Sequence, residues 1–175
     1  MKNILFHSTA LLAAVTSILF SSDLAAQAQS TQRGTDAAYI GAGVSANVTN
    51  GGQNGDAANL GGNIQGRYQI ENTPVSVRGA ILFGKETTAI MPMVSYDLGI
   101  ANNTNLYLGA GYSFVESEGR PSPLGNRNAP VVTIGAESAI GENFMVYTDG
   151  KWGIDAYQDS KADALSFQAG IGYRF

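Results

Sequence analysis

Apolar and polar residues alternate along most of the chain after residue 37, which is the pattern of β-strands with two different faces. In residues 38–49, every even position is apolar, and every odd position is glycine, tyrosine or a small polar residue. The same period of two recurs in seven further segments: 60–71, 75–84, 90–98, 106–115, 130–139, 144–154 and 165–175. Pro92 disfavours a strand in the fourth segment, 90–98, because proline cannot donate a ladder hydrogen bond. The pattern predicts an all-β chain of eight strands.

The predicted strands have roughly the 9 to 11 residues that a tilted strand needs to cross the hydrocarbon layer of a membrane. The connections between them alternate in length. The long ones are 50–59, 85–89, 116–129 and 155–164, and the short ones are 72–74, 100–105 and 140–143. Outer-membrane barrels have short periplasmic turns and longer outer loops. Residues 38–175 are therefore predicted to form an eight-stranded antiparallel up-and-down transmembrane β-barrel with both termini periplasmic.

The first 28 residues have the features of a secretory signal peptide. Lys2 gives a positive start, residues 10–20 (ALLAAVTSILF) are apolar, and Ala26-Gln27-Ala28 is a small-residue cleavage site. The apolar core falls short of the roughly 20 residues that a membrane-spanning helix needs. We predict cleavage after Ala28, which leaves residues 29–37 as a short periplasmic segment before the barrel.

Charged residues decide which face of the strands meets lipid. Eight of them lie on the polar face, with as many cations as anions, so they can neutralise one another in a lumen. They are Arg67, Glu71, Arg78, Asp97, Glu137, Asp149, Lys151 and Arg174. The opposite arrangement would turn Arg67, Arg78 and Lys151 toward lipid, at a cost of roughly 2 to 4 kcal/mol each near the midplane. We predict that these eight residues form an ion-pair network in the lumen, and that lumen-facing glycines make room for tyrosines and arginines.

The end of the chain, A-G-I-G-Y-R-F, has apolar or aromatic residues at Ala169, Ile171, Tyr173 and Phe175. It resembles the C-terminal assembly signal of outer-membrane barrels. With V-S-Y-D-L at 94–98 and G-A-G-Y-S-F at 109–114, the chain is similar to the small OmpA/OmpX-type and opacity-protein-like β-barrel family. The resemblance implies an integral outer-membrane location, contact with outer-membrane lipid and insertion by the barrel-assembly machinery. It leaves the biological role open.

Composition excludes several kinds of chemistry. The chain has no cysteine, and its only histidine, His7, lies in the predicted signal peptide, so the commonest general base and metal ligand are missing from the mature chain. The net charge of −4 argues against a nucleic-acid partner. We therefore expect a protein that is not an enzyme, with no catalytic, cofactor-binding or metal site.

Two motifs have both a structural and a functional interpretation. Gly41 to Ala46 matches a loose dinucleotide fingerprint, but no helix is predicted after it, so we interpret its glycines as lumen-facing. Asp155, Asp159 and Asp163 have the oxygen ligands that calcium prefers, but their spacing does not fit a calcium loop, and we interpret them as solvated loop charges.

The functional prediction is a non-enzymatic outer-membrane barrel that contributes to envelope integrity and whose surface-exposed loops contact an extracellular ligand or surface, as in adhesion. The loop at 116–128 has two interpretations, an adhesive loop or an inert solvated one. A narrow porin-like channel for ions or small solutes is the alternative, and the glycine-rich lumen favours it. A soluble carrier of the lipocalin kind would need the apolar face turned inward, and the charged residues argue against it.

Overall fold

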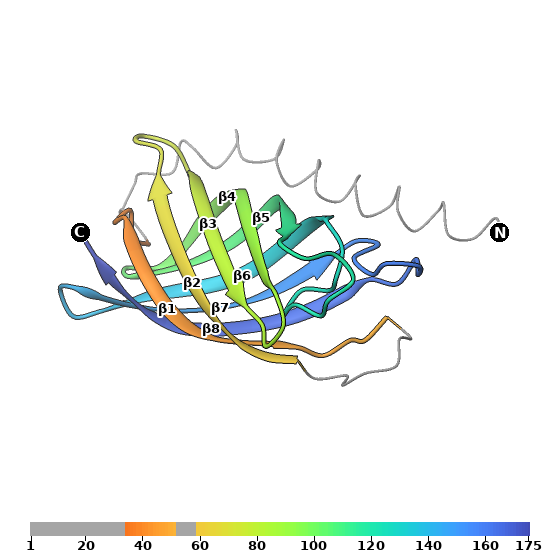
Figure 1. The fold of residues 1–175 in the computed structure, drawn as a ribbon. Helices are drawn as coiled ribbons and strands as arrows, with labels where there is room; N and C mark the ends of the chain where they lie inside the picture. Colours follow the sequence, from red (N-terminus) through yellow and green to blue (C-terminus); the bar gives the residue numbers. More distant parts are fainter. Residues whose placement is uncertain (1–33, 52–58) are drawn as a thin grey trace. The chain divides into compact units, whose positions relative to one another are not determined.

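The computed structural model describes residues 34–51 and 59–175, all within one compact unit, Gln32–Phe175. These residues form an antiparallel sheet closed into an eight-stranded barrel (Figure 1). The strands are β1 (Tyr39–Asn47), β2 (Asn59–Gln69), β3 (Val75–Phe83), β4 (Thr88–Ala101), β5 (Thr104–Val115), β6 (Ala129–Ile140), β7 (Phe144–Gly153) and β8 (Ala164–Arg174). The predicted signal peptide, residues 1–28, lies outside the described residues, among which no helix is long and apolar enough to cross a membrane.

Closure results from pairing of the first strand with the last. Val44 in β1 lies opposite Gly62 in β2 on one side and opposite Ala169 in β8 on the other. Each of the other strands pairs with its two neighbours in sequence, so the barrel has no free sheet edge. The predicted fold class is confirmed.

The proline in the fourth strand does not end it. Pro92 lies opposite Gly79 of β3, where the register continues unbroken. On its other side, the β4–β5 pairing passes from Ile90–Phe114 directly to Met93–Gly111 and leaves out both Met91 and Pro92, which lacks an N–H. The strand is therefore longer than the predicted 90–98, and only one of its two ladders is interrupted.

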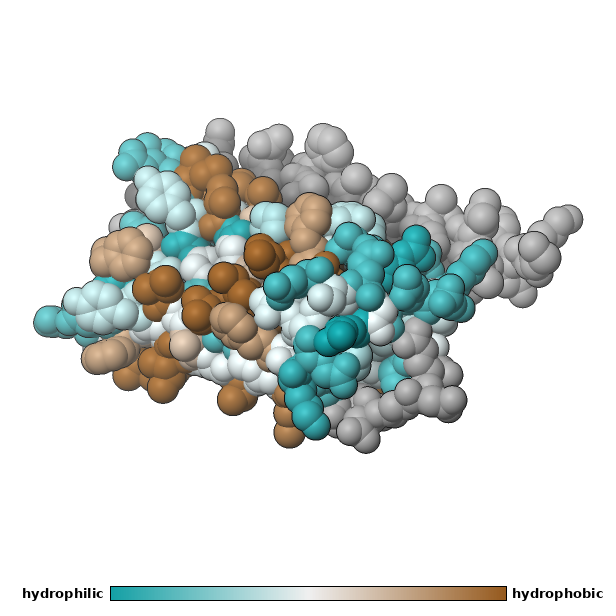
Figure 2. Space-filling view, viewed as in Figure 1, coloured by the Kyte–Doolittle hydropathy of each residue, from teal (hydrophilic) through white to brown (hydrophobic). Residues whose placement is uncertain are grey.

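The outer wall of the barrel is apolar. Val44, Leu60 and Ile134 are respectively 68%, 74% and 67% exposed, whereas their sequence neighbours point into the barrel. Figure 2 shows hydrophobic residues gathered across the wall and hydrophilic residues concentrated over the loops at one end. Exposed aromatic residues mark both ends of this wall: Tyr68, Phe144, Tyr173 and Phe175 at the end that holds the C-terminus, and Phe83, Tyr112, Phe114 and Phe167 at the other. Two aromatic girdles are typical of membrane barrels.

Lumen-facing glycines make room for tyrosine rings, as predicted. A Cβ on Gly135 would lie 2.4 Å from Cζ of Tyr107, and one on Gly170 would lie 2.3 Å from the hydroxyl of Tyr147. Both distances are far below a van der Waals contact, so only glycine allows these rings to lie flat against the wall.

The connections at the two ends differ, as predicted, with one exception. Those opposite the chain termini span 48–58, 84–87, 116–128 and 154–163, and those on the termini side span 70–74, 102–103 and 141–143. The β3–β4 connection, Gly84–Thr87, is a short turn rather than a long loop. It is short because β4 already begins at Thr88.

Candidate functional site

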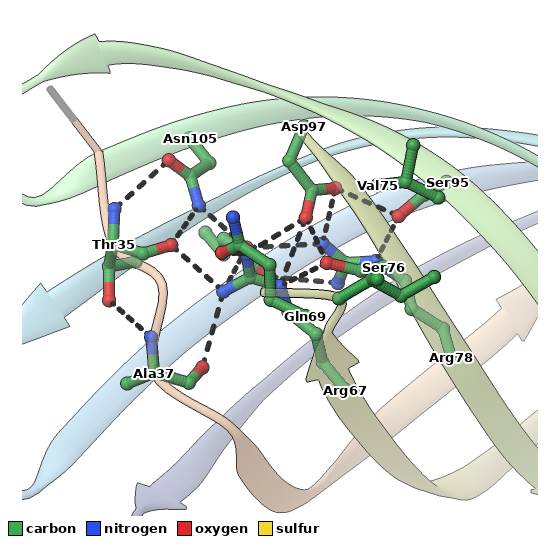
Figure 3. Close-up of polar contacts among 12 residues, drawn as sticks. Thr35, Ala37, Arg67, Gln69, Val75, Ser76, Arg78, Ser95, Asp97 and Asn105 are labelled. Atoms are coloured by element: carbon green, nitrogen blue, oxygen red, sulfur yellow. Dashed lines mark hydrogen bonds and ion pairs between the residues drawn. The ribbon is translucent and has the colours of Figure 1, made fainter. Parts of the chain in front are cut away.

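A buried ion-pair network fills the half of the lumen near the chain termini (Figure 3). Arg67 from β2, Arg78 from β3, Asp97 from β4 and Glu137 from β6 meet there, although they are far apart in the sequence. All four side chains are at most 4% exposed. Inward alternation on four strands brings them together, because a narrow barrel leaves its inward side chains little space except against one another.

Arg78 is the centre of this network. Its guanidinium contacts Asp97 at 3.0 Å and Glu137 at 2.8 Å, and its Nε donates to the hydroxyl of Ser95 at 2.8 Å. The same group lies 3.7 Å above the ring of Tyr107, in cation–π geometry. Arg78 therefore has both carboxylates, a hydroxyl and an aromatic face as partners.

Arg67 uses the same two carboxylates from the other side. It lies 2.8 Å from Asp97 and 3.3 Å from Glu137, and its Nε donates to Ser76 at 3.0 Å. Ser76 in turn hydrogen-bonds Asp97. Two cations and two anions thus form a closed four-member set.

A second buried pair lies farther from the termini. Lys151 of β7 contacts Asp149 at 2.7 Å, and the hydroxyl of Tyr107 donates to the other oxygen of Asp149 at 2.8 Å. Because Arg78 stacks on Tyr107, that ring connects this pair to the four-member set. Three cations and three anions therefore balance within the lumen.

Two of the eight predicted network residues lie elsewhere. Glu71 is exposed in the turn after β2, because the strand ends at Gln69, before the alternation in the sequence ends. Arg174 lies at the rim, where its weak hydrogen bonds reach Thr35 at 3.3 Å and the carbonyl of Glu142 at 3.5 Å. The lumen network therefore contains six of the eight predicted residues.

A strap of four residues, 34–37, crosses the mouth of the barrel on the termini side. Asn105 bonds the backbone of Thr35 twice, at 3.1 Å and 2.7 Å, and Arg67 donates to the carbonyls of Thr35 and Ala37 at 3.0 Å and 3.2 Å. Gly34 adds a backbone bond to Ala101 at 2.6 Å. The strap covers the ion-pair network, and Figure 3 shows its carbonyls directed toward Arg67.

The opposite mouth is closed by loops that fold inward. Leu124, from the 116–128 connection, is completely buried beside Ala156 and Tyr157 from the 154–163 connection. Below them, inward side chains of β3 and β4, such as Leu82 and Met91, complete an apolar cluster. We call this cluster the apolar plug. Its members are Ala80, Leu82, Ala89, Met91, Met93, Val115, Leu124, Ala129, Val131, Ala156, Tyr157 and Ala164.

A short hydrogen-bonded turn holds Leu124 in the plug. The hydroxyl of Ser122 donates to the carbonyl of Gly125 at 2.6 Å and accepts from the Leu124 N–H at 3.1 Å. Gly125 has a φ of +90°, which favours glycine. Residues 116–128 were predicted to be an outer loop without this turn, although P-S-P-L-G contains two prolines and a glycine around one large apolar residue.

The aspartates of the 154–163 connection do not form a cation site. Asp163 accepts the backbone N–H of Asp155 at 3.0 Å, so one of its oxygens is used in the loop itself. Across residues 34–51 and 59–175, no group of three or more His, Cys, Asp or Glu residues is placed to hold a metal ion. The buried carboxylates of Asp97, Glu137 and Asp149 are each engaged with a cation. The arrangement suits a structural interior in which every charge has a partner.

Comparisons with known proteins agree with this architecture. A family model described as an outer membrane protein beta-barrel domain matches residues 11–175. The search of curated proteins finds no match.

Three solved structures illustrate the similarity. Ail from Yersinia pestis, in complex with the heparin analogue sucrose octasulfate, is 19% identical with a TM-score of 0.50, over 81% of this chain and 100% of Ail. OprG from Pseudomonas aeruginosa is 9% identical with a TM-score of 0.57, over 82% and 97% of the two chains. Neisserial surface protein A is 16% identical with a TM-score of 0.55, over 79% and 97%. At these identities the likeness shows the fold alone.

Proposed function

Because this chain belongs to the outer membrane protein β-barrel domain family, we propose that it is a sealed, non-enzymatic barrel that acts through the loops opposite its termini. Membership of this family implies that the protein is integral to the outer membrane. We further propose that both termini face the periplasm and that residues 1–28 are removed as a signal peptide. The barrel-assembly machinery then inserts the chain and recognises an assembly signal formed by Ala169, Ile171, Tyr173 and Phe175.

The observation that carries this proposal is the filled lumen. One mouth is covered by the strap over the ion-pair network, and the other by the apolar plug. An interior of this kind contributes to folding and leaves the loops as the surface available for recognition. Although the 116–128 connection is anchored by Leu124, its residues 116–121 are all exposed.

The loops opposite the termini carry more acidic than basic residues. The exposed acidic residues there are Glu86, Glu116, Glu118, Asp155, Asp159 and Asp163, and the exposed basic residues are Lys85, Arg120, Arg127 and Lys161. A negative surface attracts cationic partners and repels polyanions. Ail has been crystallised with a sulfated ligand, but the charge balance here favours a partner with a basic surface instead.

The test measures binding of oligolysine and of sucrose octasulfate to the barrel in nanodiscs of zwitterionic lipid. Glu116→Gln with Glu118→Gln should weaken oligolysine binding several-fold and reduce its salt dependence. The matched control, Glu71→Gln with Glu142→Gln, removes two exposed carboxylates at the opposite end and should leave binding unchanged. Substitution is preferable to deleting the loop, because a deletion would also remove Leu124 from the plug.

Equal loss of binding in both double variants would refute a site on these loops. Binding of sucrose octasulfate in place of oligolysine would refute a cationic partner. The heat-induced shift in gel mobility, measured on each variant, establishes that the barrel is folded.

A narrow channel is the second candidate function. It is favoured by buried lumen atoms that lack a protein partner, among them the side-chain amide of Gln168. Conduction would require both the strap and the plug to move. Recordings of the pure folded protein in planar bilayers should therefore show no conductance steps, and regular steps would replace the sealed-barrel proposal with the channel.

A further inference from the structure

A polar pocket of about 240 Å³ lies at the mouth on the termini side. It is bordered by the strap, the β4–β5 turn, the β6–β7 turn and the end of β8. None of the side chains in the buried ion-pair network lines it, so it is separate from the closed interior. Pockets for drug-sized ligands begin at roughly 300 Å³, so a ligand that fits here is smaller than a drug molecule.

Arg174 supplies a positive charge to this pocket. Unlike the three cations inside the lumen, it has no carboxylate at ion-pair distance among the described residues. Its two terminal nitrogens reach only neutral oxygens, the Thr35 hydroxyl at 3.3 Å and the carbonyl of Glu142 at 3.5 Å. Its Nε is buried without a hydrogen-bond partner. A guanidinium has five N–H donors, so most of the hydrogen-bonding capacity of Arg174 is unused.

Two neutral side chains on the same lining add further donors. Asn102, exposed in the β4–β5 turn, makes no side-chain hydrogen bond within residues 34–51 and 59–175. Its neighbour Asn103 holds the turn in place by donating to the carbonyl of Ala139 at 2.9 Å. The Thr35 hydroxyl accepts from Arg174 and still has a hydrogen to donate to a ligand oxygen. Donors from three separate parts of the chain therefore border one small space.

We propose that Arg174, Thr35 and Asn102 form a binding site for the carboxylate group of a small ligand, either a peptide chain end or a free carboxylic acid. The planar fork of a guanidinium matches the two oxygens of a carboxylate, and the long contacts to neutral oxygens do little to hold Arg174 in its present orientation. Asp36 lines the same pocket, and its negative charge disfavours a doubly charged phosphate more than a singly charged carboxylate. The site lies at the opposite end from the loops and is independent of their proposed function.

The test is a titration of the folded ¹⁵N-labelled barrel in detergent micelles, followed by two-dimensional NMR. N-acetylglycine carries one carboxylate, and N-acetylglycinamide is the matched molecule without the charge. We expect N-acetylglycine to shift the signals of Asn102, Asn103 and the Arg174 side chain in a saturable way, with a dissociation constant on the order of 1 mM. N-acetylglycinamide should shift none of them. Equal shifts with the neutral amide, or no saturable shift with N-acetylglycine, would overturn the proposal.

Two further probes identify the source of the carboxylate. Acetate that binds at least as tightly as N-acetylglycine indicates a free carboxylic acid, and tighter binding of N-acetylglycine indicates a peptide chain end. Both results support the carboxylate site. Binding of inorganic phosphate in preference to both carboxylates would overturn it.

Two variants connect binding to the pocket. Arg174→Gln should weaken N-acetylglycine binding at least about ten-fold, because hydrogen bonds between charged groups are lost. Arg120→Gln removes an exposed arginine at the opposite end and should leave binding unchanged. Because Arg174 adjoins the proposed assembly signal, Asn102→Asp gives a second test in an exposed turn, where the new negative charge should also weaken binding. Unchanged binding in either pocket variant, with the barrel shown to be folded by its gel mobility, would overturn the proposal.

Discussion

Replacing Glu137 by glutamine tests how deeply the ion-pair network is buried. Glu137 lies 2.8 Å from Arg78 and 3.3 Å from Arg67, and it accepts from Asn105 at 3.0 Å. Glutamine keeps the shape but removes the charge, leaving two guanidiniums to share Asp97. Removing one partner of a buried pair typically costs about 3 to 5 kcal/mol. That loss is a large part of the free energy of unfolding of a typical domain, which is roughly 5 to 15 kcal/mol.

The assay is equilibrium unfolding in urea of the barrel refolded into lipid vesicles, followed by the fluorescence of Trp152, the only tryptophan in the chain. Glu71→Gln, in an exposed turn, is the control and should change the free energy of unfolding by less than about 0.5 kcal/mol. Adding Arg78→Gln to Glu137→Gln restores charge balance, so the double variant should lose less than the sum of the two single losses. A loss below about 1 kcal/mol for Glu137→Gln would match a solvated surface pair and would refute a closed lumen.

Three further substitutions test the tyrosine packing and the two seals. Gly135→Ala should lower stability by about 1 to 3 kcal/mol in the same urea assay, because the new methyl lies 2.4 Å from Tyr107; an unchanged midpoint would contradict the ring placement. Leu124→Ala should cost about 2 to 5 kcal/mol, whereas a solvated loop leucine would cost almost nothing. Gly34→Ala should release the strap and its amide protection from hydrogen exchange, because φ is +93° and the methyl would lie 2.0 Å from a neighbouring side chain. Gly141→Ala, with φ +64° and open space around it, should leave that protection intact.

The alternation of apolar and polar residues was enough to predict the barrel and most strand ends, because each strand has one face toward lipid and one toward the interior. It assigned Arg78 and Glu137 to the inner face without showing that they touch. Their contact depends on how far neighbouring strands are shifted along one another, which a single strand's pattern does not contain. The same limit explains Glu71 and Arg174, whose positions fit the alternation but lie beyond the enclosed part of the lumen.

The two seals were not predicted, for a related reason. Leu82 and Met91 fall on the inner face with the charged residues, and only the folded barrel shows that they belong to an apolar layer at one end. Leu124 is a single apolar residue in a polar connection, so no periodicity marks it as buried. Residues 34–37 lack strand alternation and are held by contacts with Arg67 and Asn105, which come from distant parts of the chain.

Labelling of the native protein from within the lipid shows which face of the strands meets the membrane. A diazirine carried on the acyl chains generates a carbene on illumination, and mass spectrometry locates the labelled residues. We expect labels on outward residues such as Val44, Ile134 and Phe167, and none on the buried Met91 or Met145. Labels on those two methionines, with the outward residues unlabelled, would show that the apolar wall faces away from the membrane and would refute the membrane barrel.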